Sequence, residues 1–213
     1  MLRRNALIRK LPAVETLGSV TVICSDKTGT LTENRMTVTV VDVAGKSVDF
    51  KERFRDYSPQ ISPLDAPQPE IIKDVSVALL LSGGALCNDA YLEENPEEKG
   101  GFTTVGDPTE GALVVVAAQA GLWKEQLEKA LPRVDEVPFD SDRKRMTTVH
   151  DIRMDALPEA LRASLEKYPG ALGSGRIAFT KGAVDGMLDI STHVWANDVA
   201  EPMTEEWRRR ILK

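Results

Sequence analysis

A carboxylate able to accept a phosphoryl group follows a short apolar run near the start of the chain. Asp26 follows residues 19–24, with only Ser25 between, and the β-branched side chains of that run favour a buried strand. Its side chain is therefore expected at the carboxyl end of that strand, where ligands of α/β sheets bind. A carboxylate oxygen can attack phosphorus to form an acyl phosphate, while Lys27 adds positive charge and Gly29 lets backbone N–H groups approach phosphate oxygens. Asp26 is thus a candidate nucleophile; the alternative for any one of these residues is an Asp-led turn with glycine in a left-handed conformation.

A second candidate site combines one aromatic ring with three consecutive cations. Phe139 stands shortly before Arg143-Lys144-Arg145, and Met146 follows them. An aromatic face can stack on a base, and cations beside it can neutralise phosphates. A Phe that ends a strand is more commonly a core residue, however, and a run of charges is more commonly a solvated turn. Both interpretations stand on the residues alone.

Two further segments place charged side chains near turns. Lys181 and Gly182 follow the strand-like residues 176–180 and present a cation beside unobstructed backbone. Asp107 is suited to cap a helix that has Pro108 in its first position and Glu110 three residues after the cap. Glu110 therefore has two interpretations, a capping-box partner or a ligand-binding carboxylate.

The segment 26–32, Asp-Lys-Thr-Gly-Thr-Leu-Thr, resembles the phosphorylation motif of the P-type ATPases without a mismatch. The resemblance implies that Asp26 is phosphorylated by the γ-phosphate of ATP, with Mg²⁺ bound by the Asp26 carboxylate and the main-chain carbonyl of Thr28. Related haloacid-dehalogenase-type phosphatases usually carry an Asp general acid/base at the position of Thr28. A threonine cannot do that work at neutral pH, so the residue argues against a soluble phosphatase.

The other segments resemble the nucleotide-binding domain of the same family, in its calcium-pump branch. By that resemblance Phe139 stacks on adenine, Lys144 reaches the polar side of the nucleotide, Lys181 lies at the back of the pocket, and Glu110 accepts a hydrogen bond from the adenine amino group. The residues implied to bind ATP are Glu110, Phe139, Lys144, Met146, Lys181 and Gly182. The segment 85–90 matches a further family signature, which we interpret as packing.

The composition of the chain argues against several classes of partner and environment. Lys and Arg number 27 against 33 Asp and Glu, which gives a net charge of −6 and argues against a nucleic-acid partner. Cys24 and Cys87 lie in apolar contexts and are expected to be buried thiols without a disulfide. The longest apolar stretch, 75–81, is far shorter than the roughly 18 to 20 residues of a bilayer crossing. We therefore expect no membrane insertion of this chain.

The elements expected to position these residues alternate between helices and strands. We predict one helix at 71–81 that ends at Gly83-Gly84, and further helices at 108–121, 123–131, 157–168, 184–190 and from 205 onward. We predict strands at 36–43, 46–50, 134–139, 145–152 and 176–180. The residues 93–101 are expected to form a solvated loop. Hairpin-like strand pairs favour an α+β fold in which an antiparallel sheet is flanked by helices. A short piece of a haloacid-dehalogenase-like phosphorylation domain precedes it.

The resemblance divides the chain into two parts. Residues 1–34 are the end of a stalk and the start of the phosphorylation domain, and residues 35–213 are most of the nucleotide-binding domain, with a hinge near Glu33-Asn34. The basic residues among positions 3–10 and the uncapped helix at Lys213 predict a longer parent protein. The implied function is the ATP-binding portion of a cation pump on the cytosolic face of a membrane. It would work with the phosphorylation, actuator and transmembrane domains, and alone it would bind ATP or ADP with little turnover. The alternative is a stand-alone nucleotide-binding or regulatory module.

Overall fold

The chain divides into two compact units, Met1–Arg35 and Met36–Lys213. The computed structural model describes residues 19–22, 24, 25, 27, 36–43, 45–50, 73–95, 101–166, 173–196 and 199–213. In the first unit, the predicted buried strand at 19–24 is wrong for the residues described. Val20 and Val22 are 45% and 73% exposed, and Cys24 is exposed as well. A strand is stabilised by neighbours that pair with its backbone, and the described residues of this unit have no strand pairing.

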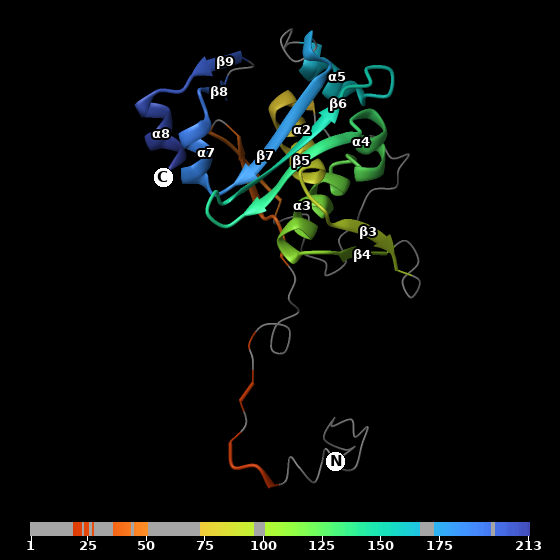
Figure 1. The fold of residues 1–213 in the computed structure, drawn as a ribbon, viewed down its shortest axis with the longest axis vertical. Coiled ribbons are helices and arrows are strands. Elements are labelled where there is room, and N and C mark those ends of the chain that lie inside the picture. The colour runs from red at the N-terminus through yellow and green to blue at the C-terminus, as the bar shows by residue number, and fades with distance from the viewer. Residues whose placement is uncertain are drawn as a thin grey trace. The chain divides into compact units, whose positions relative to one another are not determined.

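The second unit combines short helices with antiparallel strands (Figure 1). Its helices are α2 (Val75–Leu86), α3 (Pro108–Gln119), α4 (Lys124–Ala130), α5 (Glu159–Glu166), α7 (Val184–Ile190) and α8 (Glu205–Ile211). Its strands are β1 (Val40–Val43), β2 (Lys46–Asp49), β3 (Tyr91–Glu94), β4 (Phe102–Val105), β5 (Arg133–Asp140), β6 (Arg145–Asp151), β7 (Arg176–Gly182), β8 (His193–Ala196) and β9 (Val199–Pro202). The strands pair as β1–β2, β3–β4, β5–β6–β7 and β8–β9, all antiparallel. The predicted α+β class with antiparallel strands and flanking helices is confirmed.

The three-stranded sheet has one face covered by helices. Along β6 every second residue is buried, namely Met146, Thr148 and His150. Directly paired residues of antiparallel strands point to the same face, so the β7 partners of these residues, among them Lys181 and Phe179, face the helices too. Figure 1 shows α2 and α3 behind this sheet, and α2 contacts β7. This layer is where α3 can present side chains to the end of β7.

Helix α2 is central to the hydrophobic core. It contacts α3, α4, α5, β1 and β7. Its side chains in the core cluster are almost entirely buried: Val77, Ala78, Leu81, Ala85 and Leu86. Burial of large apolar side chains contributes about 1.5–3 kcal/mol each. The burial of α2 against its neighbours therefore holds in place the helices that pack against the three-stranded sheet.

The predicted break at Gly83-Gly84 is wrong, because α2 continues to Leu86. Gly83 lies against Phe179 of β7, and a Cβ atom at residue 83 would come within 2.7 Å of the ring. Gly84 lies against Leu113 of α3 at an ordinary distance, 3.7 Å. A glycine inside a helix costs about 1 kcal/mol relative to alanine. Here close packing of a ring against the helix offsets that cost.

Most other predicted elements are confirmed with small changes in their ends. The N-caps at Asp107 and Thr204 are present, and α7 has the predicted bounds. The 93–101 loop prediction is wrong at its start, because β3 extends to Glu94 and pairs with β4. The β8–β9 hairpin was not predicted.

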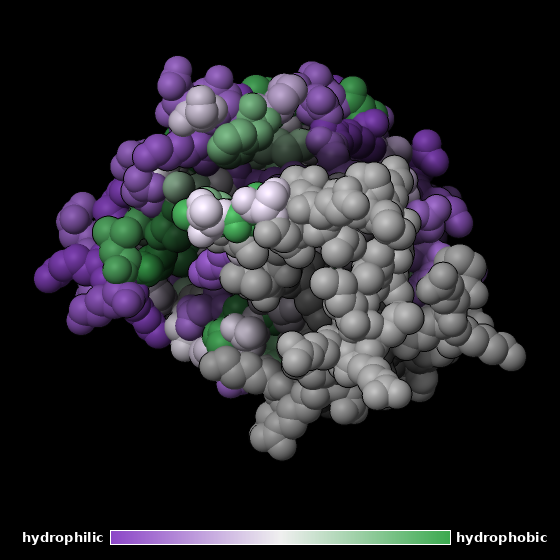
Figure 2. Space-filling view, turned by 90° about the horizontal axis from the view of Figure 1, so that it is seen from below, coloured by the Kyte–Doolittle hydropathy of each residue, from purple (hydrophilic) through white to green (hydrophobic). Residues whose placement is uncertain are grey.

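Figure 2 shows one face of the molecule, on which the coloured residues form hydrophilic areas with smaller hydrophobic areas between them. Within the described ranges, none of the helices has both the length and the apolar character that a bilayer crossing requires. Cys87 is buried as predicted, whereas the prediction of a buried Cys24 is wrong because its side chain is exposed; both cysteines are free thiols.

Candidate functional site

Five of the residues predicted to bind a nucleotide belong to one end of the β5–β6–β7 sheet. They are Phe139 near the end of β5, Lys144 in the following turn, Met146 in β6, and Lys181 and Gly182 at the end of β7. Met146 pairs with Lys181, and Arg145 pairs with both Gly182 and Asp140. The strand register thus gathers segments that are about forty residues apart in the sequence.

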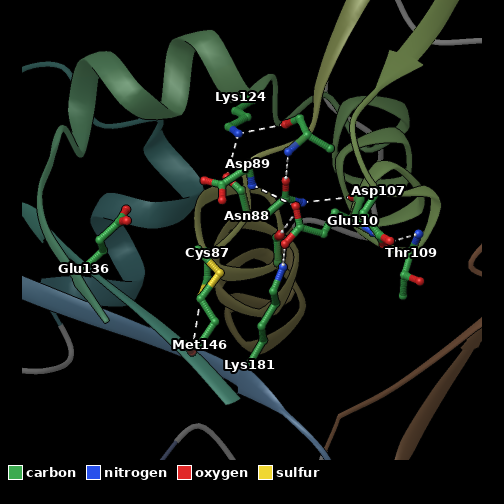
Figure 3. A network of polar contacts seen from close by, with 12 residues as sticks. Cys87, Asn88, Asp89, Asp107, Thr109, Glu110, Lys124, Glu136, Met146 and Lys181 are labelled. Atoms are coloured by element: carbon green, nitrogen blue, oxygen red, sulfur yellow. Dashed lines mark hydrogen bonds and ion pairs between the residues drawn. The ribbon is translucent and has the colours of Figure 1, made fainter. Parts of the chain in front are cut away.

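Glu110 joins this group through an ion pair with Lys181. The Lys181 ammonium donates to Oε1 of Glu110 at the start of α3, and the two side chains are 26% and 20% exposed. The other carboxylate oxygen, Oε2, accepts a hydrogen bond from the backbone N–H of Asp89 at 3.0 Å (Figure 3). Both oxygens of Glu110 are therefore directed toward β7 and the end of α2.

The capping role falls to Asp107. Its Oδ1 accepts hydrogen bonds from the backbone N–H groups of Glu110, at 3.2 Å, and Thr109, at 2.8 Å. These two bonds stabilise the ionised carboxylate and lower the pKa of Asp107. Because the Glu110 carboxylate bonds to Lys181 and Asp89, the capping-box interpretation does not describe its side chain.

The turn from β5 to β6 fixes the backbone of Lys144. Asp140 accepts hydrogen bonds from the backbone N–H groups of Arg143 and Asp142, which lower the pKa of its carboxyl. Lys144 has a φ of 50°, a left-handed conformation that costs a non-glycine residue about 1 kcal/mol or more. Its N–H donates to the Asp140 carbonyl, and its own carbonyl accepts from Ala183 N–H at 3.2 Å. The strained residue is therefore held between β5 and the end of β7.

Gly182 is required by a close approach of backbone. A Cβ atom there would lie 2.5 Å from the Lys144 carbonyl oxygen and 2.7 Å from Cβ of Arg145. Any other residue would push the end of β7 away from the turn. Gly182 therefore determines how near Lys181 and Lys144 come to each other.

Phe139 and Met146 differ in exposure. Phe139 is 64% exposed, so the core interpretation of this residue is not supported. Met146 is 3% exposed, and its carbonyl oxygen lies 3.5 Å from the Cys87 thiol. The Phe139 ring is open to a ligand, whereas Met146 is buried on the neighbouring strand β6.

The predicted phosphorylation residues belong to the other unit. Lys27 is exposed, while Asp26 and Thr28 lie outside the described residues. Within the part of the chain that the structure describes, no three His, Cys, Asp or Glu residues gather in a way that would hold a metal ion.

The sequence interpretation missed the polar role of the segment between α2 and β3. We name Cys87, Asn88, Asp89 and Ala90 the Asn88 loop. Asn88 is fully buried, and its amide donates to the carbonyls of Gly84, at 3.1 Å, and Glu110, at 2.9 Å. It also accepts from Ala90 N–H at 2.7 Å. An Asn inside an otherwise apolar run was the available signal, since a buried amide needs hydrogen-bond partners.

Comparison with known proteins identifies the family. Residues 76–213 match the family model described as P-type ATPase, cytoplasmic domain N. The chain is 41% identical over 88% of its length to a cation-transporting ATPase of Synechocystis, and 39% identical over its whole length to a calcium-transporting ATPase of Bacillus cereus. It is 31% identical over its whole length to an endoplasmic reticulum-type calcium-transporting ATPase of Arabidopsis thaliana. The matched region covers 19%, 19% and 20% of those proteins, about a fifth of their length. With the antiparallel α+β fold described above, these matches show that the chain belongs to the P-type ATPases and contains their cytoplasmic domain N.

Proposed function

We propose that this chain is the ATP-binding portion of a P-type cation-transporting ATPase, and that the adenine base binds at the end of β5–β6–β7. The observation that carries the proposal is the Lys181–Glu110 ion pair. It brings together two residues that are 71 positions apart, at the strand end that also bears Phe139, Lys144 and Met146. An aromatic face, an acceptor and a cation are the groups that recognise a purine nucleotide.

Each residue has a role that its position supports. The exposed ring of Phe139 stacks on the base, which is worth about 1–3 kcal/mol in single-stranded nucleic-acid complexes. Glu110 accepts a hydrogen bond from the adenine amino group, and Lys181 donates to the nucleotide at the back of the pocket. Lys144 reaches the polar side, Met146 lines the pocket, and Gly182 leaves room for the backbone.

The Lys181–Glu110 pair holds both side chains ready for a ligand. Both are partly buried, so their bonds to a base would form in surroundings less polar than water, where hydrogen bonds are stronger. Glu110 keeps one oxygen on Asp89 N–H and can turn the other from Lys181 to the base. The binding group is therefore organised before the nucleotide arrives.

For the whole protein we propose phosphoryl transfer from ATP to Asp26. An oxygen of the Asp26 carboxylate forms a bond to the γ-phosphorus, the bond from that phosphorus to the β–γ bridging oxygen breaks, and ADP leaves. The oxygen donors of Asp26 and Thr28 are of the kind Mg²⁺ prefers, and Mg²⁺ bound there would neutralise phosphate charge. Positioning dominates such reactions, so the chain alone should bind ATP and turn it over slowly.

The proposed setting is the cytosolic face of a membrane. The parent protein would supply the rest of the phosphorylation domain, the actuator domain and the transmembrane helices that carry the cation. A hinge near Glu33-Asn34 would let the nucleotide-binding part approach Asp26.

The test is a titration of the chain with ATP and ADP, followed by backbone amide NMR. We expect the largest shifts at Phe139, Lys144 and Lys181, and loss of these shifts in Phe139→Ala. Tyr91→Ala is the matched control, because Tyr91 is an exposed aromatic residue, 49% accessible, on β3. Shifts that cluster elsewhere, or that survive Phe139→Ala, would refute the pocket.

A further inference from the structure

The Asn88 loop contacts α3, β5 and β6, the elements that carry Glu110, Phe139 and Met146. The Cys87 thiol lies on the carbonyl of Met146 in β6, and Asn88 and Asp89 both bond to Glu110 in α3. Figure 3 shows these contacts converging on the end of α2, with Lys181 approaching the Glu110 carboxylate from β7. A four-residue loop thus connects α2, α3 and the sheet.

Glu110 is held by this loop at two points. The Asn88 side-chain amide donates to the Glu110 backbone carbonyl at 2.9 Å, which fixes the first turn of α3. The Asp89 backbone N–H donates to carboxylate Oε2 at 3.0 Å, which fixes the end of the side chain. Two points of attachment on one residue set the direction in which its second oxygen, Oε1, faces.

The loop is itself held from α4 and β5. The Lys124 ammonium donates to the carbonyls of Asn88 and Ala90, both at 2.8 Å, and only a tenth of its side chain is exposed. Burial lowers the pKa of Lys124, whereas the carboxylate of Glu128 nearby favours its charged form. Arg133 of β5 donates to the Asp89 carboxylate at 2.7 Å. The backbone carbonyls on either side of Asp89 are therefore fixed independently of Glu110.

We propose that Asn88 is a positioning residue for base selectivity: through Glu110 it determines whether the pocket distinguishes an amino group from a carbonyl at the purine 6-position. This inference rests on the proposed function, because Glu110 must face the base for its position to matter. Asn88 touches no nucleotide and acts only by holding α3 and the loop backbone. Its loss should therefore reduce selectivity rather than binding in general.

The experiment measures the Kd of the chain for ATP and for inosine 5′-triphosphate (ITP), which has a carbonyl oxygen where ATP has the amino group. A lost hydrogen bond to a charged acceptor corresponds to about tenfold or more, so wild type should prefer ATP by about that factor. Glu110→Gln should bring the ratio near one, since an amide can accept from an amino group or donate to a carbonyl. Asn88→Asp keeps the acceptor for Ala90 and loses both donors. It should lower the preference about threefold or more, with the Kd for ITP nearly unchanged.

Lys124→Met tests the same idea without altering Asn88, in case Asn88→Asp does not fold. It removes two bonds to the loop and should lower the preference in the same direction. Thr148→Val is the matched control, because it removes a buried hydrogen bond of β6 that involves neither the loop nor Glu110. It should leave the ATP/ITP ratio unchanged.

The outcomes separate the two proposals. If wild type shows no preference and Glu110→Gln has no effect, the proposed base contact fails. If Glu110→Gln lowers the ratio while the folded loop variants, Asn88→Asp or Lys124→Met, do not, positioning by the loop is refuted and the base contact stands. If the preference for ATP over ITP fell as much in Thr148→Val as in the loop variants, the proposal would also be refuted, because the change would then reflect a general loss of packing in the domain.

Discussion

The Phe179 ring of β7 lies against the backbone of α2 at Gly83, where a Cβ atom would come within 2.7 Å of the ring carbon Cδ1. The ring has little freedom to retreat, because it also makes an edge contact with His150, with ring centroids 5.6 Å apart. Helix and sheet can therefore approach at this point only if residue 83 has no side chain.

We expect Gly83→Ala to destabilise the fold by about 1–3 kcal/mol, the usual cost of overpacking. Alanine is the better helix former, and propensity alone would predict the opposite sign. Gly84→Ala is the matched control, because its Cβ would meet Leu113 at 3.7 Å, an ordinary contact. That variant should be neutral or more stable by up to about 1 kcal/mol. Urea unfolding of both proteins measures the difference, and equal effects would contradict the packing argument.

Gly182→Ala should affect both stability and nucleotide binding. The added methyl group would meet the Lys144 carbonyl at 2.5 Å, so the end of β7 must move from the turn. We expect a loss of about 1–3 kcal/mol in unfolding free energy, together with weaker ATP binding. Gly173→Ala is the control, since nothing lies within 4 Å of its Cβ. Wild-type affinity in a folded Gly182→Ala protein would show that this approach does not shape the site.

The elements were largely predictable from the sequence because their ends carry local signals. Asp107 with Pro108, and Thr204, are caps whose hydrogen bonds form within the next few residues. The error at Gly83 has a tertiary cause. Whether Gly83 ends a helix depends on Phe179, which comes from a strand 96 residues later (179 − 83), and no local pattern contains that information.

The residues of the candidate site could be predicted from the sequence, but the hydrogen bonds and the ion pair that join them could not. The resemblance selected Glu110 and Lys181, but the ion pair between them depends on the packing of α3 against the end of β7. Asn88 was interpreted as packing because its amide donates to the backbone carbonyls of Gly84 and Glu110. Every residue has a backbone carbonyl, so the sequence does not indicate which ones would accept these bonds. Buried polar networks are defined by three-dimensional geometry, so sequence patterns indicate their members only weakly.

His150 should make the fold less stable in mild acid. The side chain is 1% exposed, and Nδ1 donates to the Leu131 carbonyl, which leaves Nε2 of the neutral imidazole as an acceptor 2.8 Å from the Thr148 hydroxyl. Burial lowers the pKa of His150 below its usual value of 6.5, with the charges of Arg133 and Lys124 acting in the same direction. Below pH 6.5 the unfolded chain therefore binds a proton that the folded chain does not, and stability decreases as the pH falls through that value.

Urea unfolding at several values between pH 8 and pH 5 tests this prediction. Wild type should lose stability across the interval, and His150→Gln, which has no titrating ring, should show a flatter profile from a lower starting point. Asp107 and Asp140 have lowered pKa values, so their effect on stability comes at more acidic pH and does not overlap this window. An equal slope in both proteins would show that His150 is not the group responsible.

Phe139→Ala should separate binding from folding. Because the ring is 64% exposed, its removal should change the free energy of unfolding by no more than about 0.5 kcal/mol. Loss of stacking on the base should weaken ATP binding by about tenfold, which corresponds to the lower part of the stacking range. Phe179→Ala should do the reverse: the partly buried Phe179 ring packs on Gly83 and His150, so its loss should destabilise the fold. Calorimetric titration and urea unfolding of each variant give both quantities. If Phe139→Ala left the affinity unchanged in a folded protein, the exposed ring at the end of β5 would have no part in holding the purine.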